Sequence, residues 1–406
     1  MEKGKARAGR VDDLLSFSLE MMNGGDGKVL MEKYKEAISA ITPHDMLEME
    51  DRQLRLGVGA GTIKKDIEKI INVFFHGLNA YPRLAPAEES FFYYLILENQ
   101  AFTFRLNQVK KLLRSYHGRE TTELESLARL LHDAFTSFLE FEAHYQKKEN
   151  ILFPFLEKHL KSYRPLKVMW SLHDDIRSRL RELIAMTAAP TGWQSLNVLI
   201  GKYFSLVFRM IQKEELIVFP VALEVLDEAD QGDMHFQSFD YPFPFIEAPA
   251  PPVKLPGNRT TDIPKAGESS TDSHGIPELS SLLMLFDHLP VEITYVDEND
   301  RVAFFNKGLD RIFPRSNAVI GRLVQNCHPP ESVHVVESII GEFRSGRKDH
   351  ADFRIWMRGR FILIRYFAVR DHSGAYKGVL EISQDITDIV SLEGEQRLLD
   401  WDSNGL

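Results

Sequence analysis

The sequence predicts a multidomain protein with an all-α N-terminal part, a small helical domain plus a four-helix bundle, followed by an α+β domain. Three observations support this fold class. The chain has 406 residues, more than one ordinary core accommodates. Apolar residues recur at helical spacing through most of the chain up to residue 228. After residue 276, alternating apolar runs separated by turn-forming residues are typical of antiparallel strands.

The first domain is expected over residues 1–82. Amphipathic helical spacing is present in "VDDLLSFSLEMM", "VLMEKYKEAISAI" and "IKKDIEKIINVFFHGL", and glycine clusters separate these stretches. Thr42 is suited to cap the N-terminus of another helix, because Pro43 would then occupy its first turn, where the missing N–H costs nothing. A small helical domain follows from these patterns.

The bundle is expected over residues 85–228. Long helical patterns run over residues 88–116, 122–160, 166–186 and 195–226, and their short connections indicate an up-down arrangement. Pro154 and Pro220 fall at matching points inside the second and fourth patterns. Each is expected to kink its helix, since proline lacks the N–H and crowds the preceding turn.

The rest of the chain divides into a linker, an α+β domain and a tail. Helical periodicity stops near Glu228, so we expect a proline-rich linker over residues 229–276. The α+β domain is expected over residues 277–390, with two strands in "EITYVDEN" and "RVAFFN", helical stretches such as "VHVVESIIGEF", and then three antiparallel strands. We expect an acidic helical tail over residues 391–406.

Composition excludes several functional classes. The net charge of −10 argues against nucleic-acid and membrane-surface partners, because phosphate affinity needs clustered Lys and Arg. The only cysteine, Cys327, excludes a disulfide framework and a cysteine-rich metal site, and it fits a reducing compartment. No signal-peptide core and no run of roughly 18 apolar residues is present. We therefore expect a soluble, cytoplasmic protein.

One stretch is written twice. "HYQKKENILFPFLEKH" begins at His144, and "MIQKEELIVFPVALEV" begins at Met210. Alignment of the two copies pairs Lys148 with Glu214 and Glu149 with Glu215. Matching carboxylates on two helices of one bundle, together with His144 and His173, are the oxygen and imidazole ligands that iron prefers.

These stretches also resemble a known family. "HYQKKENILFPFLEK", "VMWSLHDDIR" and "KEELIVFPVALEVL" resemble the hemerythrin-like HHE cation-binding domain. "FDHLPVEITYVDENDRVAFFN", "VIGRLVQNCHPPESVHVVESI" and the ending "EISQDITDI" resemble a PAS domain. The chain as a whole, over nearly all of its length, is similar to a prokaryotic group that joins a helical domain of unknown function, an HHE bundle and a PAS domain.

The resemblance implies a ligand set for iron, as a di-iron centre or a smaller one. Its members are His144, Glu149, His173 and one of Glu214 or Glu215. On an ideal helix the five-residue offset from His144 to Glu149 is about 140° of rotation. The residue four positions after His144 is Lys148, which cannot ligate while charged.

The chain departs from the family pattern at several positions. Ser90 and Tyr93 stand where the first bundle helix of relatives carries histidines, and Met210 replaces another histidine. Tyr93 is a further candidate ligand, because a phenolate can bind ferric iron. Glu98 is expected to be exposed or to cap a helix. The alternatives are a weaker, incomplete metal site, or a bundle that has lost its metal and keeps these residues for packing.

The PAS resemblance implies a pocket between sheet and helices, with an unknown ligand, and a homodimer. Cys327 and His328 stand side by side before two prolines, so they are candidates for haem ligation or redox sensing. The alternative is that these residues form the loop that starts the following helix.

Together these features favour a non-enzymatic sensory or regulatory protein that responds to oxygen, redox state or iron and passes its signal to an unknown protein partner. A di-iron redox enzyme or an oxygen- or nitric-oxide-handling protein is one alternative. A metal-free interaction scaffold is another. Phosphate-loop, dinucleotide and Ser-His-Asp patterns do not occur in the sequence.

Overall fold

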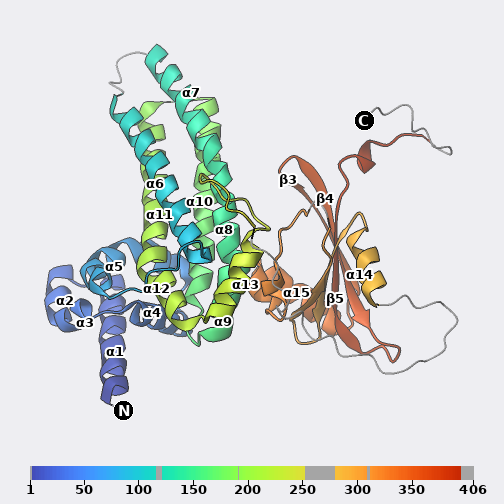
Figure 1. Cartoon of the computed structure of the whole chain (residues 1–406), viewed down its shortest axis with the longest axis horizontal. Helices are drawn as coiled ribbons and strands as arrows, with labels where there is room; N and C mark the ends of the chain where they lie inside the picture. The colour runs from blue at the N-terminus through green and yellow to red at the C-terminus, as the bar shows by residue number, and fades with distance from the viewer. Residues whose placement is uncertain (1, 116–120, 191, 252–278, 309–310, 395–406) are drawn as a thin grey trace. The chain divides into compact units, whose positions relative to one another are not determined.

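The computed structural model describes residues 2–115, 121–190, 192–251, 279–308 and 311–394. These residues divide into a helical unit, which contains the described residues up to 251, and an α+β unit, which contains most of those from 279 onward. The predicted fold class is confirmed, because the N-terminal two-thirds of the chain is helical and the sheet lies in the C-terminal third (Figure 1). Within the described ranges, every helix is too short or too polar to span a bilayer.

The N-terminal helices are α1 (Glu2–Met22), α2 (Gly27–Lys33), α3 (Lys35–Ser39), α4 (Pro43–Arg55) and α5 (Ala60–Ala80). The predicted helical stretch after Gly27 is divided at Tyr34 into α2 and α3. Thr42 caps α4 as predicted. Its hydroxyl accepts the N–H of Asp45 at 3.2 Å, and the Asp45 carboxylate accepts the N–H of Thr42 at 3.0 Å.

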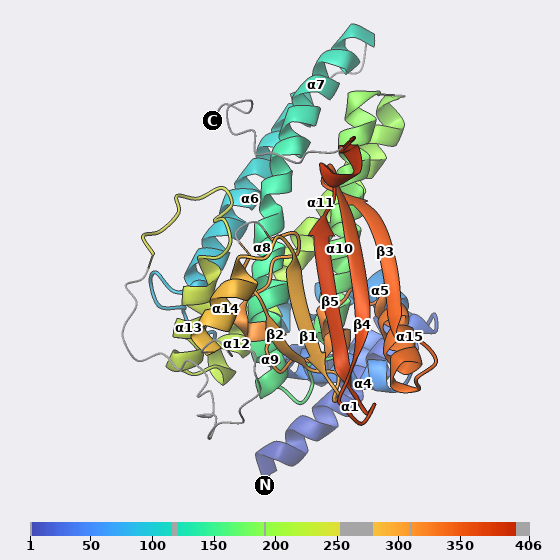
Figure 2. The same ribbon diagram turned by 90° about the vertical axis from the view of Figure 1, so that its right-hand side faces the viewer.

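The bundle has the predicted four helical rods, and α6, α7, α10 and α11 run alongside one another (Figures 1 and 2). The first rod is α6 (Phe91–Ser115) and the third is α10 (Pro165–Ala188). The second consists of α7 (Thr121–Ser137), a 3₁₀ turn (Phe138–Phe141), α8 (Glu142–Lys147), a π-helical turn (Lys148–Leu152) and α9 (Phe153–His159). The fourth consists of α11 (Trp193–Lys213), a π-helical turn (Glu214–Val218) and α12 (Phe219–Val225).

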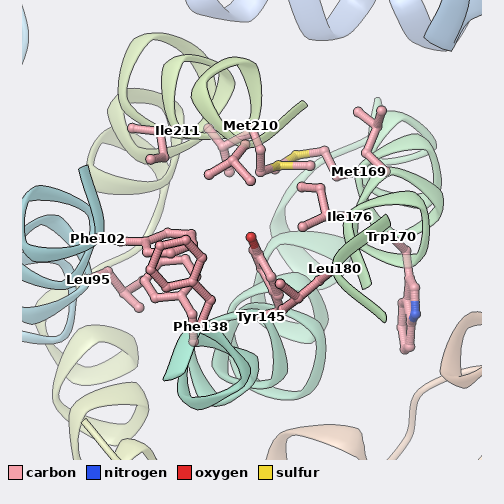
Figure 3. Close-up of a cluster of buried hydrophobic side chains, with 14 of the residues drawn as sticks. Leu95, Phe102, Phe138, Tyr145, Met169, Trp170, Ile176, Leu180, Met210 and Ile211 are labelled. Atoms are coloured by element: carbon pink, nitrogen blue, oxygen red, sulfur yellow. The ribbon is translucent and has the colours of Figure 1, made fainter. Parts of the chain in front are cut away.

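Apolar side chains from all four rods form a buried cluster inside the bundle. Figure 3 shows Met210 of α11 meeting Met169 of α10, with the Tyr145 hydroxyl pointing toward them. Phe102 of α6 packs edge-on against Phe138, with ring centroids 5.1 Å apart. Met210, which the family pattern expects to be a histidine, is therefore a buried core residue.

The predicted linker over residues 229–276 is wrong in its first part. Helix α13 (Glu228–Ser238) begins here, because the Asp227 carboxylate caps it by accepting the N–H of Asp230 at 2.8 Å. The aromatic residues that follow pack on the bundle: Phe245 stacks on Phe141 with centroids 6.0 Å apart. The packing of these aromatic residues extends the helical domain into a segment that its proline content had indicated to be a linker. Residues 252–276 of that prediction lie outside the described residues.

The α+β unit contains α14 (Leu279–Asp287), β1 (Glu292–Asp297), β2 (Val302–Phe305), α15 (Val333–Arg344), β3 (His350–Met357), β4 (Arg360–Arg370) and β5 (Tyr376–Asp385). The strands form one antiparallel sheet in the order β2-β1-β5-β4-β3. At Gly378 in β5, φ is +138° and an added Cβ would lie 2.0 Å from the Val296 carbonyl oxygen, so only glycine fits. Residues 395–406 of the predicted tail lie outside the described residues.

Candidate functional site

Each π-helical turn of the bundle lies directly before a Phe-Pro pair. The N–H of Phe153 bonds to the carbonyl of Lys148, and the N–H of Phe219 bonds to that of Glu214. The proline that follows has no N–H and its ring crowds the preceding turn, which accounts for a widened turn at the point where the sequence predicted a kink. A π-helical turn contains more residues than an α-helical turn, so it also changes which of the following side chains face the bundle interior.

His144 lies at the centre of the bundle between two carboxylates. Its Nδ1 is 2.7 Å from Oε2 of Glu98, and its Nε2 is 3.2 Å from Oε2 of Glu214. All three side chains are buried. Both ring nitrogens of His144 thus face carboxylate oxygens.

Two lysines with 1% and 0% exposure, Lys147 and Lys148, complete the same centre. Lys147 Nζ donates to Oε1 of Glu98, and Lys148 Nζ donates to Oε1 of Glu214. Burial lowers the pKa of both lysines, and the paired glutamates oppose that effect. Burial alone would raise the pKa of Glu214, but Lys148 and His144 outweigh it and hold that pKa well below its usual range.

Glu149 forms a second cluster with His173 and Arg177. Its Oε1 accepts from His173 Nδ1 at 2.8 Å, and its two oxygens accept from Nη1 and Nη2 of Arg177, each at 2.9 Å. Burial, together with Lys148 and Arg177, lowers the pKa of His173 well below its usual value. His173 is therefore neutral, and its buried Nε2 has no hydrogen-bond partner among the described residues.

The remaining predicted residues lie at the margin of these clusters. Glu215 is partly exposed, and Asn99 Nδ2 donates to Glu214 at 3.0 Å and to Glu215 at 3.4 Å. Burial, and the neighbouring Glu214, raise the pKa of Glu215. Tyr93 is partly exposed and packs edge-on against Tyr94, with ring centroids 5.4 Å apart. Helix α6 thus reaches the clusters through residues 98 and 99.

The α+β unit holds a cavity of about 30 Å³ between its sheet and α15. By the same measure a water molecule needs about 10–15 Å³, so the cavity has room for about two water molecules. Its apolar lining comes from valines and isoleucines of β1, β5 and α15, and its polar lining from His328, Tyr366 and Glu381. Burial lowers the pKa of His328, whose Nδ1 donates to the Val324 carbonyl at 2.9 Å.

Cys327 and His328, which the sequence analysis considered as a pair, thus have different environments. His328 lines the cavity, whereas Cys327 is partly exposed with its Sγ 3.7 Å from the Leu323 carbonyl oxygen. Haem and redox roles for these two residues remain predictions.

Comparison with known families identifies two domains in the chain. The profile of the hemerythrin HHE cation binding domain matches residues 81–222, and that of a PAS domain matches residues 282–387. The chain joins an HHE domain to a PAS domain. The helical region before residue 81 precedes both.

Solved structures give further likenesses to the PAS part. A C-terminal domain from Streptococcus mutans is 30% identical, with 30% of this chain and 96% of that chain covered and a TM-score of 0.29. The PAS domain of BvgS from Bordetella pertussis is 21% identical, with coverages of 28% and 89% and a TM-score of 0.24. A sensory box sensor histidine kinase from Vibrio cholerae is 16% identical, with coverages of 27% and 93% and a TM-score of 0.21. A search of curated proteins found no match.

The residues of the HHE domain do not fit a di-iron centre as they are arranged. His144 and Glu214 bond to each other and to lysine or glutamate, and Glu149 bonds to His173 and Arg177. Among the described residues, no group of three or more His, Cys, Asp or Glu side chains is placed to hold a metal ion. The donor types that the family uses are present, but protein cations engage them.

The sequence reasoning missed several residues of this network. The expectation that Glu98 is exposed or caps a helix is wrong, since it is 0% exposed. The stretch "LENQA" places Glu98 and Asn99 directly after the apolar and aromatic run "FFYYLIL", which was a signal for buried polar partners. The opposite charges of Lys148 and Glu214 at equivalent positions of the repeat were a second signal.

Proposed function

We propose that the chain is a non-enzymatic sensory or regulatory protein whose PAS domain receives a signal and whose helical unit presents a surface to an output partner. The observation that carries this proposal is the PAS cavity, which is apolar except for His328, Tyr366 and Glu381. An apolar lining with a few convergent polar groups is typical of a ligand site. Oxygen, redox state and iron are the candidate signals.

Strand β5 connects the cavity to the end of the domain. Glu381 lines the cavity, and β5 ends four residues later at Asp385. There the Thr387 hydroxyl donates to Asp385 Oδ1 at 2.6 Å and accepts the N–H of Phe361 at 2.8 Å. A shift of β5 would therefore act on this junction, through which the chain leaves the domain.

Filling the cavity in the full chain tests this proposal. Val336 of α15 lines the cavity, and its neighbour Val335 is 36% exposed. We expect Val336→Phe to change amide hydrogen exchange in β5 and at residues 385–391, and Val335→Phe to leave both unchanged. A Val336→Phe effect confined to α15 would contradict the proposal. The same measurement on the wild type in air, under anaerobic reductant and with ferrous iron distinguishes the candidate signals.

We also propose a homodimer through the PAS domain. Helix α14 exposes an apolar surface, with Met284 60% and Leu285 59% exposed. Such a surface is typical of an interface. We expect the double variant Met284→Glu, Leu285→Glu to sediment as a monomer and the wild type as a dimer, in analytical ultracentrifugation of the full chain. Equal masses for the two proteins would contradict the proposal.

The two alternatives make different demands on the bundle. A di-iron redox enzyme or oxygen-handling protein needs carboxylates that are available to metal, and the ion pairs of Glu98, Glu149 and Glu214 weigh against it. A metal-free scaffold needs only a stable binding surface. The ion pairs of these buried glutamates are compatible with that role for the HHE domain. Alanine at both His144 and His173 changes neither metal content nor partner binding if the bundle is a scaffold.

A further inference from the structure

We infer that the ammonium groups of Lys147 and Lys148 take the places of metal cations in this bundle, so that the HHE domain closes around protein cations and does not hold iron. This inference is independent of the role proposed for the PAS domain. It follows from the charges, the hydrogen bonds and the positions of the buried side chains.

The first argument is charge. Each buried carboxylate at the bundle centre has its own basic partner on another part of the bundle: Glu98 pairs with Lys147, and Glu214 with Lys148. Arg177 is the partner of the third carboxylate, Glu149. Burying these acids unpaired would be costly, and a metal ion is one remedy for that cost. Here basic side chains supply the positive charge.

The second argument is ligand availability. All six oxygens of Glu98, Glu149 and Glu214 already accept hydrogen bonds from protein nitrogen atoms. Both ring nitrogens of His144 face carboxylates. Among the side chains of Glu98, Glu149, Glu214, His144 and His173, the one possible ligand atom without a hydrogen-bond partner within the described residues is Nε2 of His173. A single nitrogen is too few ligands for iron, which needs several imidazole and carboxylate ligands.

The third argument is position. Lys148 and Glu214 occupy equivalent places in the two π-helical turns, and they meet across the bundle. The Lys148 ammonium also lies over the Tyr145 ring, 4.7 Å from its centroid, and interacts electrostatically with Glu149 and His173. Lys148 therefore interacts with predicted ligands of both clusters that the structure contains. An incoming metal ion would have to displace it, and the basic groups of Lys147 and Arg177 would repel that ion.

Cobalt binding to the full chain tests this inference. Protein prepared without chelator is equilibrated with Co²⁺ in the absence of oxygen, desalted, and analysed for metal and for visible absorption. Ligands of the imidazole and carboxylate kinds bind Co²⁺ as well as iron, so we expect below about 0.1 cobalt per chain in wild type and at least a tenfold gain in Lys148→Ala. Lys161→Ala, at an exposed lysine of the same domain, is the matched control and should behave as wild type.

Where the Lys148→Ala variant folds, either of two results would overturn the inference. One is wild-type protein that retains about one cobalt per chain and loses it in Glu214→Gln. The other is a folded Lys148→Ala variant that binds no more cobalt than wild type. If the variant does not fold, the wild-type melting temperature decides: we expect Co²⁺ or EDTA to shift it by less than about 1 °C, and a rise of several degrees that Glu214→Gln abolishes would overturn the inference.

Discussion

The two copies of the repeated stretch have the same backbone and different chemistry. Both contain a π-helical turn that ends before Phe-Pro, Lys148–Leu152 in one and Glu214–Val218 in the other. The first copy, however, starts with a buried histidine in a polar cluster, and the second starts with Met210 in the apolar core. The comparison teaches that the turn is a property of the local sequence, whereas the chemistry is set by single positions around it.

The same contrast holds for two equivalent lysines. Lys147 pairs with Glu98 inside the bundle, whereas Lys213, at the equivalent position of the second copy, pairs with Glu50 of α4 at 2.7 Å. One copy therefore closes the bundle, and the other attaches the N-terminal helices to it. Buried lysines of the helical unit therefore have carboxylate partners both within the bundle and in the N-terminal helices.

The largest expected effect comes from removing one acid of the second copy. Glu214→Ala leaves the Lys148 ammonium buried without its partner, so we expect a loss of about 3–5 kcal/mol in the free energy of unfolding. The adjacent Glu215→Ala, at a partly exposed residue, should cost less than about 1 kcal/mol. Urea denaturation of both variants makes the measurement. Equal losses would mean that the two neighbouring glutamates are not distinguished by burial.

A smaller effect concerns the histidine that follows the first copy. The pKa of His173 is lowered by burial, Lys148 and Arg177, with Glu149 accepting from its Nδ1. Below about pH 6.5 the unfolded chain therefore binds a proton at this histidine that the folded chain does not bind. As the pH decreases from about 8 to 5, the free energy of unfolding decreases, by up to about 1.4 kcal/mol per pH unit. His173→Gln should show a shallower fall in urea denaturation across this range. An unchanged slope would contradict the assignment of a neutral His173.

The smallest expected effect tests the shared backbone. Pro154→Ala and Pro220→Ala each give the unfolded chain more freedom, which should cost about 0.4–1 kcal/mol. Because the two turns are equivalent, we expect the two losses, measured by urea denaturation, to agree. A difference above about 1 kcal/mol would show that one turn depends on its surroundings more than the other.

Local signals in the sequence predicted most of the fold. Thr42 with Pro43 indicated the start of α4, the repeated Phe-Pro indicated the irregularity in two helices, and alternation indicated the five strands. These features depend on residues close together in the chain. The same reasoning failed after Asp227, because the burial of aromatic residues such as Phe245 depends on the bundle surface they meet.

Only some members of the charge network could be predicted from the sequence. His144, Glu149, His173 and Glu214 were selected from the sequence, and all four are buried at the bundle centre. Their partners were not predictable from spacing, since Lys148 meets Glu214 across the bundle and not along one helix. Helical periodicity says which face a residue occupies, but it does not say which residue of another helix lies opposite.

Diffraction at the iron absorption edge from crystals grown with ferrous salt tests the central claim most directly. We expect no anomalous peak inside the bundle, and electron density for the Lys148 side chain that reaches the carboxylate of Glu214. An anomalous peak bound by Glu149, His173 and Glu214, with the lysine turned away, would contradict the claim that protein cations replace the metal.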